Sequence, residues 1–223
     1  VLNVVEGEIQ VTQGETLMIH AGTTVKFMGN YSFQVYGDLY VMGEEGNMVT
    51  FTSGEPMPSN GDWGGIYLYD NTYYEGSCDN YSSAIDCVNA GCSWTSDGGY
   101  CYGEGGMPVD GTIVVQYATI EYGQYGLYVN DTYDNNITIS NNTIQHSSSY
   151  GIRTRYSGPI ISGNTIKNNN NGMSLVYSNP IVTGNIIKDN IDYGIYGYGY
   201  DSTSGPMISE NIIENNQEWG IYF

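Results

Sequence analysis

The sequence predicts an all-β protein wound as a parallel β-solenoid, with about eight three-sided coils in one domain over residues 1–223. Short apolar segments recur at a regular period, three of them fall within each period, and Gly, Asn, Ser or Pro separate them. The composition agrees, because 31 residues are Gly, 23 are Tyr and only 13% are charged. Many turn formers and few helix formers favour strands joined by tight turns.

Three apolar series run through the second half of the chain. The Ile residues of a repeated Asn-Thr-Ile or Asn-Ile-Ile phrase are 22, 21 and 26 residues apart: Ile144, Ile166, Ile187 and Ile213. A second series follows Gly: Leu127, Ile152, Met173, Ile195 and Ile221. A third series precedes each Asn: Val115, Ile139, Ile161, Val182 and Ile208. Three inward residues per period predict three stacked walls around one core.

The first half repeats with the same period but less regularly. Ile9 recurs as Phe33, 24 residues later, and we align residues 25–27 with residues 49–51 at the same step. The Asn that recurs at one corner is typical of a turn. Its side chain can bond backbone groups, and stacked Asn side chains can also bond the coil above.

Long stretches of the chain resemble a known repeat. The segments TIEYGQYGLYVNDTYDNNITISNNTIQHSSSYGIRT and PIISGNTIKNNNNGMSL resemble the right-handed parallel β-helix repeat of the pectin-lyase-like superfamily, and TTVKF, GDLYV, VTFTS and WGGIYL are similar to the start of such domains. The resemblance covers nearly the whole chain, is closest to secreted or surface proteins of bacteria and archaea, and implies a right-handed coil. It implies no single function, because the superfamily includes polysaccharide lyases, hydrolases, epimerases, adhesins and inert repeats.

A Cys-rich insertion at residues 71–111 interrupts the period. The step from Ile66 to Leu127 is 61 residues, about 39 more than one repeat. All four cysteines lie in this block: Cys78, Cys87, Cys92 and Cys101. We expect two disulfides rather than a zinc site, because zinc ligands normally come as Cys-x-x-Cys or with His, and His20 and His146 lie elsewhere. Their pairing is open, and they predict an extracellular or cell-surface location.

The charge of the chain disfavours several classes of partner. With 24 acidic and 5 basic residues, the formal net charge is −19. Such a surface repels phosphate backbones and anionic lipids, and no apolar run reaches the ~18–20 residues of a membrane span. We therefore expect neither nucleic-acid binding nor membrane insertion.

No catalytic constellation stands out in the sequence. The lyases that it resembles use Arg or Lys to abstract a proton, and Arg153 and Arg155 form the best candidate pair, unless they are simply exposed surface residues. A nucleophile elbow, a phosphate loop and a zinc-protease motif are all absent. The sequence favours a non-enzymatic protein without a cofactor or a metal site. A polysaccharide lyase or hydrolase is an alternative, and so is Ca²⁺ bound at the acid-rich corners.

Two further series place aromatic residues on the outside of one wall. One series follows the Gly-apolar pairs and points outward: Tyr67, Tyr128, Arg153, Ser174, Tyr196 and Tyr222. The other directly precedes each Gly: Tyr125, Tyr150, Asn171, Tyr193 and Trp219. A functional interpretation is a stacking surface for sugars or for another solenoid. A structural interpretation is that the rings shield the Gly backbone and stabilise the ladder.

The ends of the chain suggest a structural role. Val1 begins a strand-like segment, and the sequence stops within a rung that contains Trp219 and Phe223, without a polar cap. We expect either a product cut from a longer protein or ends that neighbours cover. We therefore predict an extracellular structural solenoid that assembles end to end into a filament, with Tyr67, Tyr128, Tyr196, Tyr222, Trp219 and Phe223 at interfaces. A carbohydrate-binding adhesin module is the alternative, so the expected partner is a second copy or a polysaccharide.

Overall fold

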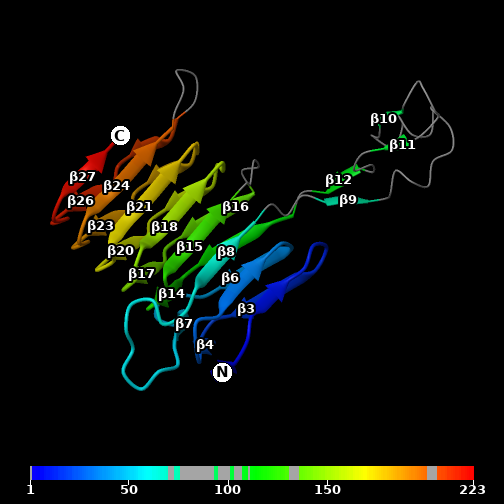
Figure 1. Ribbon diagram of the computed structural model, residues 1–223, viewed down its shortest axis with the longest axis horizontal. Coiled ribbons are helices and arrows are strands. Elements are labelled where there is room, and N and C mark those ends of the chain that lie inside the picture. The colour runs from blue at the N-terminus through cyan, green and yellow to red at the C-terminus, as the bar shows by residue number, and fades with distance from the viewer. Residues whose placement is uncertain are drawn as a thin grey trace.

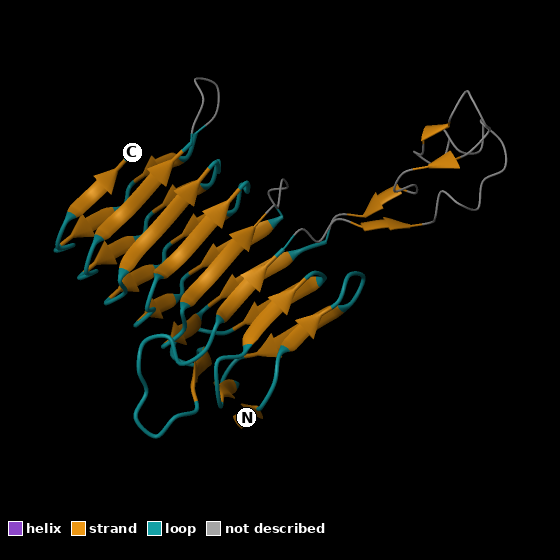
Figure 2. Ribbon diagram, in the orientation of Figure 1, coloured by secondary structure: helices purple, strands orange, loops and turns teal. Residues whose placement is uncertain are grey.

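A computed structural model describes residues 2–69, 73–75, 93–94, 101–102, 107–109, 111–130, 136–199 and 205–223. Three long parallel sheets surround a common interior, and the described residues contain no helix (Figures 1 and 2). The chain passes from sheet A to sheet B to sheet C and back, and the sheets have 8, 8 and 7 strands. This makes seven complete coils and two walls of an eighth. The predicted all-β solenoid of about eight three-sided coils is confirmed.

Each sheet collects every third strand of the solenoid. Sheet A contains β1 (Leu2–Val5), β4 (Thr24–Phe27), β7 (Val49–Ser53), β14 (Ala118–Glu121), β17 (Thr143–Gln145), β20 (Thr165–Lys167), β23 (Ile186–Lys188) and β26 (Ile212–Glu214). Sheet B contains β2 (Ile9–Val11), β5 (Ser32–Val35), β8 (Gly65–Leu68), β15 (Tyr125–Asn130), β18 (Tyr150–Arg155), β21 (Asn171–Val176), β24 (Tyr193–Tyr198) and β27 (Trp219–Tyr222). Sheet C contains β3 (Thr16–His20), β6 (Asp38–Met42), β13 (Ile113–Gln116), β16 (Ile137–Ser140), β19 (Ile160–Ser162), β22 (Ile181–Thr183) and β25 (Met207–Ser209).

The apolar series of the sequence form the inner ladders of these sheets. Ile120 lies beside Ile144, Leu127 beside Ile152, and Val115 beside Ile139, as the repeat steps predict. All six side chains are fully buried. Because each ladder contributes one or two buried residues per coil, the interior is a continuous column of aliphatic side chains.

One alignment in the first half is wrong by two residues. Val25 lies beside Phe51 rather than beside Val49, and Phe27 lies beside Ser53. The turn before β7 contains a Glu44–Asn47 bridge, which lengthens this coil. A shift of two keeps the same residues facing inward, so the alternating pattern cannot distinguish the two registers.

A buried aromatic pair lies in the core of the second and third coils. The Trp63 ring stacks on the Phe27 ring with centroids 4.1 Å apart and planes 3° apart, and both residues are fully buried. The Trp63 indole N–H donates a hydrogen bond of 2.9 Å to the backbone carbonyl of Glu121. The pair therefore fills the interior and also ties the loop before β8 to the following coil.

Asn side chains form a buried ladder where sheet C turns into sheet A, as the repeated phrase predicts. Asn142, Asn164, Asn185 and Asn211 follow one another along the axis, and each side-chain Nδ2 donates 2.9 Å to the Oδ1 of the next Asn. Each Oδ1 also accepts from a backbone N–H of the preceding coil, for example from Asn142 at 3.0 Å. The side chains thus pair backbone groups that a buried corner would otherwise leave unsatisfied.

A second Asn ladder, which was not predicted, follows sheet A at the turn into sheet B. Asn169, Asn190 and Asn216 bond one another in the same way, at 3.2 and 2.8 Å. Asn169 Oδ1 also accepts the backbone N–H of Ser147 at 2.9 Å. The steps of 21 and 26 residues between these Asn residues match those of the Ile series, so this ladder could have been predicted from the sequence.

The Cys-rich block at residues 71–111 lies between β8 and β13. Its described parts are two antiparallel pairs: β9 (Tyr73–Glu75) with β12 (Met107–Val109), and β10 (Ser93–Trp94) with β11 (Cys101–Tyr102). Cys78, Cys87 and Cys92 lie outside the described residues, and only the backbone of Cys101 is described. The two disulfides therefore stay a prediction.

In the described part of the chain, no helix is long and apolar enough to cross a membrane.

Candidate functional site

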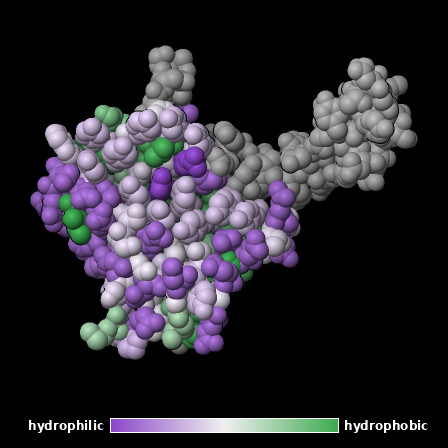
Figure 3. Space-filling model, viewed as in Figure 1, coloured by the Kyte–Doolittle hydropathy of each residue, from purple (hydrophilic) through white to green (hydrophobic). Residues whose placement is uncertain are grey.

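The outer face of sheet B gathers the two predicted aromatic series into adjacent rows. Tyr67 lies beside Tyr128, Tyr128 beside Arg153, and Tyr196 beside Tyr222. This wall faces the viewer in Figure 1, and in Figure 3 much of it has the pale colours of intermediate hydropathy. The structure brings the predicted residues together, while their role as an interface stays a prediction.

Neighbouring rings on this wall pack against one another along the solenoid axis. Tyr36 stacks on Tyr69 with centroids 4.5 Å apart, and Tyr196 stacks on Tyr222 at 5.8 Å with planes 4° apart. A ring that stacks on its neighbour has that face covered. The stacked pairs therefore present mainly ring edges and hydroxyl groups to solvent, which supports part of the structural interpretation.

Two clusters divide the wall. The Tyr–Arg cluster consists of Tyr67, Tyr125, Tyr128, Tyr150, Arg153 and Arg155, and the terminal aromatic cluster consists of Tyr193, Tyr196, Trp219 and Tyr222. The rung between them has the small side chains of Asn171 and Ser174, which are 6% and 1% exposed. The series before Gly is thus interrupted at Asn171, and the outward series has no ring at Arg153 and Ser174.

The two arginines of the Tyr–Arg cluster rest on aromatic rings instead of on carboxylates. The Arg153 guanidinium carbon is 5.2 Å from the Tyr128 ring centroid and 5.5 Å from that of Tyr150, and the Arg155 carbon is 4.8 Å from that of Tyr156. Among the described residues, the one ion pair joins Lys188 to Asp189. Arg153 Nε is buried and has no hydrogen-bond partner among these residues. Two cations that have no acidic partner within the described residues are unexpected in a chain of net charge −19.

The surroundings of Tyr67 and Arg155 favour the protonated form of both side chains. Burial, followed by the nearby Tyr125, raises the pKa of Tyr67 to about 12. Hydrogen bonding to the Tyr156 side chain is the main cause of the raised pKa of Arg155. The Arg155 guanidinium therefore stays charged and the Tyr67 hydroxyl stays protonated, so that this hydroxyl can donate or accept a hydrogen bond.

The comparisons with known proteins bear on the family of this chain. A model of the right-handed β-helix region matches residues 98–223, which is more than half of the sequence. The chain belongs to the right-handed β-helix family. The predicted family and its right-handed coil are confirmed, and no curated protein matches the sequence.

One solved structure similar to this β-helix is a point mutant of the periplasmic alginate epimerase AlgG. The identity is 17% and the TM-score is 0.48, and the match covers 99% of this chain. It covers 55% of the epimerase chain, so this β-helix spans about half of that protein's length. A likeness of this degree carries no argument about activity.

Several residues of the wall were missed by the sequence analysis. Tyr36, Tyr69, Tyr156, Tyr177 and Tyr198 lie at or just beyond the ends of sheet B strands, where they extend the surface towards sheet C. A Tyr at the end of successive repeats could have indicated these residues in the sequence, but the number of residues between these tyrosines varies with the length of the turns.

In the described part of this β-helix, no group of His, Cys, Asp and Glu is arranged to hold a metal ion.

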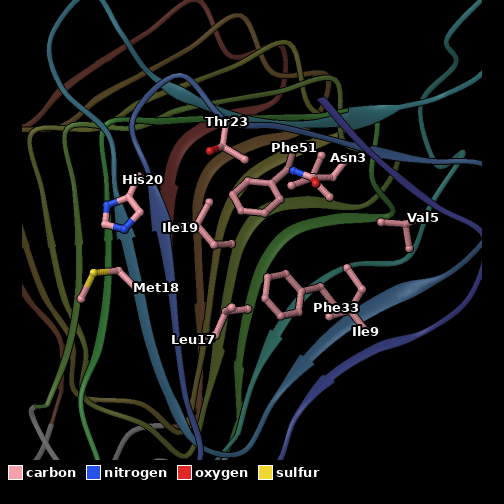
Figure 4. A pocket seen from close by; sticks show the side chains of 11 residues that line it. Asn3, Val5, Ile9, Leu17, Met18, Ile19, His20, Thr23, Phe33 and Phe51 are labelled. Atoms are coloured by element: carbon pink, nitrogen blue, oxygen red, sulfur yellow. The ribbon is translucent and has the colours of Figure 1, made fainter. Parts of the chain in front are cut away.

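A separate hollow of about 370 Å³ opens into the interior of the first coils. Figure 4 shows the apolar side chains of Leu17, Ile19, Phe33 and Phe51 around it, with Asn3 and His20 nearby. At the other end, Trp219 and Phe223 are 55% and 57% exposed. Trp219 belongs to the terminal aromatic cluster, and neither Trp219 nor Phe223 is part of the buried core.

Proposed function

We propose that this β-helix is an extracellular or cell-surface protein that binds acidic polysaccharide on the outer face of sheet B. The observation that supports it best is the pair Arg153 and Arg155, which aromatic rings hold at the surface without a carboxylate partner among the described residues. A guanidinium on an aromatic face keeps its outward N–H groups available. These groups match the geometry of a carboxylate or a sulfate ester.

The surrounding tyrosines suit the rest of a sugar. Their hydroxyls can bond sugar hydroxyls, and their uncovered ring surfaces can pack against the C–H groups of a pyranose ring. Residues on one face of a strand recur about every 6.6 Å, and neighbouring strands are ~4.8 Å apart, so the wall presents side chains at regular intervals in both directions to an extended polymer. A long surface that repeats suits a chain of sugars better than a compact ligand.

The net charge of the chain does not forbid an acidic ligand. In the described residues most carboxylates lie in turns, for example Glu44, Asp189 and Glu218, and not on the outer face of sheet B. At physiological ionic strength the Debye length is ~8 Å, so distant carboxylates are largely screened. Among the described residues, Glu8 is a carboxylate that acts on Tyr67 of the cluster, while Arg153 and Arg155 supply its positive charge.

A polysaccharide survey tests the proposal. The wild-type chain should bind polymers that contain uronic acids or sulfate esters and should bind neutral polymers of similar linkage at least about 10-fold more weakly, because only the former pair with Arg. Replacing Tyr67 and Tyr128 together by Ala should weaken the binding, because both belong to the Tyr–Arg cluster. Equal binding of acidic and neutral polymers, or no binding, would contradict the proposal, and release of unsaturated or reducing ends would assign a lyase or hydrolase instead.

End-to-end assembly into a filament stays a second proposal. The apolar hollow at the first coils and the exposed Ile221 and Phe223 of the last coil favour it, because both are surfaces that another coil would cover. A second copy and further coils of one longer polypeptide would make similar contacts. The acidic polysaccharide is therefore the better-supported partner.

A further inference from the structure

We infer that the binding surface continues around the corner from sheet B to sheet C, where Tyr156, Tyr177 and Tyr198 hold the sugar unit next to the one bound by Arg153 and Arg155. This inference rests on the proposed function and specifies the direction in which the bound polysaccharide runs. The polysaccharide would cross the wall along β18 towards this corner, instead of following the solenoid axis past the terminal aromatic cluster.

The backbone at this corner is unfavourable for the side chains that occupy it. Tyr156 and Tyr177 have φ angles of 47° and 48°, in the left-handed region where a Cβ is crowded. The next coil has Gly199 at the corresponding position, with φ 86°. Glycine adopts such angles without strain. The same left-handed angles recur at other corners of the coil, for example at Tyr117 with φ 50°. The angle therefore marks a corner, and the case for these two tyrosines rests on the arrangement and exposure of their rings.

The three rings form an open row that continues from Arg155. The Tyr156 ring stacks on Tyr177 with centroids 5.2 Å apart, and Tyr177 meets Tyr198 edge to face at 5.6 Å. Tyr177 and Tyr198 are 44% and 57% exposed, which is unusual for such large side chains in a packed array. An edge-to-face pair covers fewer ring faces than a stacked pair, so this corner offers aromatic surface to a sugar ring.

We infer the direction in which the polysaccharide runs from the positions of the side chains that suit sugar binding. Along the axis, Arg153 is followed by the small and buried Ser174. Along β18, Arg153 is followed on the same face by Arg155 and then by Tyr156, whose ring lies 4.8 Å from the Arg155 guanidinium. A sugar next to the one at the arginines therefore finds partners at the corner and few on the next rung.

A purely structural role for these rings is the alternative. A Cβ placed on Gly199 would come within 2.4 Å of the Tyr177 ring, so this ring covers the Gly199 backbone. If covering this backbone is all that Tyr177 does, its removal would change the stability of the fold and leave the binding constant unaltered.

The substitution Tyr177→Gly separates the two roles. Glycine suits φ 48°, so relief of strain should offset the lost packing, and Tm should stay within about 3 °C of the wild type. The Kd for a uronic-acid or sulfated polysaccharide that the wild type binds should rise about 5- to 10-fold. Tyr177→Phe keeps the ring and should keep most of the affinity. Tyr117→Gly makes the same change at φ 50° where sheet C meets sheet A, and should leave the Kd unchanged.

The outcomes distinguish this inference from the function on which it rests. An unchanged Kd for Tyr177→Gly, with or without a fall in Tm, would overturn the corner site while wild-type binding of acidic polymers stands. An equal loss of affinity in Tyr117→Gly would also overturn it, because the effect would then not be specific to this corner. Failure of the wild type to bind any acidic polysaccharide would overturn the proposed function itself.

Discussion

Asn164→Leu should lower the stability of the fold by about 3–5 kcal/mol, because it removes the centre of the longer Asn ladder. The Asn164 side chain is fully buried, accepts from the backbone and side chain of Asn142, and donates to Asn185 and to the carbonyl of Ile139. Leu has a similar volume but no polar atoms, so the buried N–H of Asn142 would lose its acceptor. With ~2–4 °C per kcal/mol for a chain of this size, calorimetry should record a fall in Tm of roughly 6–20 °C.

A matched control uses an Asn outside the ladder. Asn179 is exposed, and its backbone N–H donates to the Ser157 carbonyl, a bond that a change of side chain leaves in place. Asn179→Leu should therefore shift Tm by no more than about 2 °C. Equal shifts for Asn164 and Asn179 would show that the ladder contributes little, and that side-chain stacking at this corner was wrongly assigned a stabilising role.

Trp63→Ala should destabilise the first coils by about 3–5 kcal/mol, since it empties the largest site in their core. Trp63 is fully buried, stacks on Phe27 at 4.1 Å and donates to the Glu121 carbonyl. The substitution removes the ring contact and leaves a cavity. It also removes the donor to Glu121. Chemical denaturation should show a lower midpoint, with the loss largest for probes in the first three coils.

Two other variants complete this experiment. Trp63→Phe keeps an aromatic ring and should cost less than Ala, because only part of the ring and the indole N–H are lost. Trp219→Ala makes the same truncation at a residue that is 55% exposed, and should cost under about 1 kcal/mol. A similar loss for Trp63→Ala and Trp219→Ala would contradict the assignment of Trp63 to the core.

Much of the fold could be predicted because each coil of a solenoid repeats a similar residue pattern. The spacing of Ile144, Ile166 and Ile187 predicts the neighbours that the structure pairs, since stacked coils of similar length must bring equivalent residues together. The misaligned register of Val25 shows the limit of this reasoning. The alternation of apolar and polar residues indicates which face of the strand a residue occupies. A longer turn can shift the strand by two residues without changing the face on which each residue lies.

The candidate site could be predicted only in part. The outward row from Tyr67 to Tyr222 follows from the register alone, so the sequence was sufficient to place it. The packing of Arg153 on Tyr128 depends on side-chain rotamers, which repeat spacing does not encode. The strained Tyr177 was missed for a related reason: the left-handed corner is visible only in the backbone angles.

The binding constant of Arg153→Gln/Arg155→Gln for an acidic polysaccharide tests the central claim most directly. The control is Lys167→Gln/Lys188→Gln, which also removes two positive charges, but from the outer face of sheet A, where the two lysines are neighbours. Removing two charge-assisted contacts of about 1.5 kcal/mol each should weaken binding by at least about 100-fold in the arginine variant. The lysine variant should stay within about 3-fold of the wild type. Equal losses in both variants would show that net charge alone governs binding, and no loss in the arginine variant would contradict the Tyr–Arg cluster as the site.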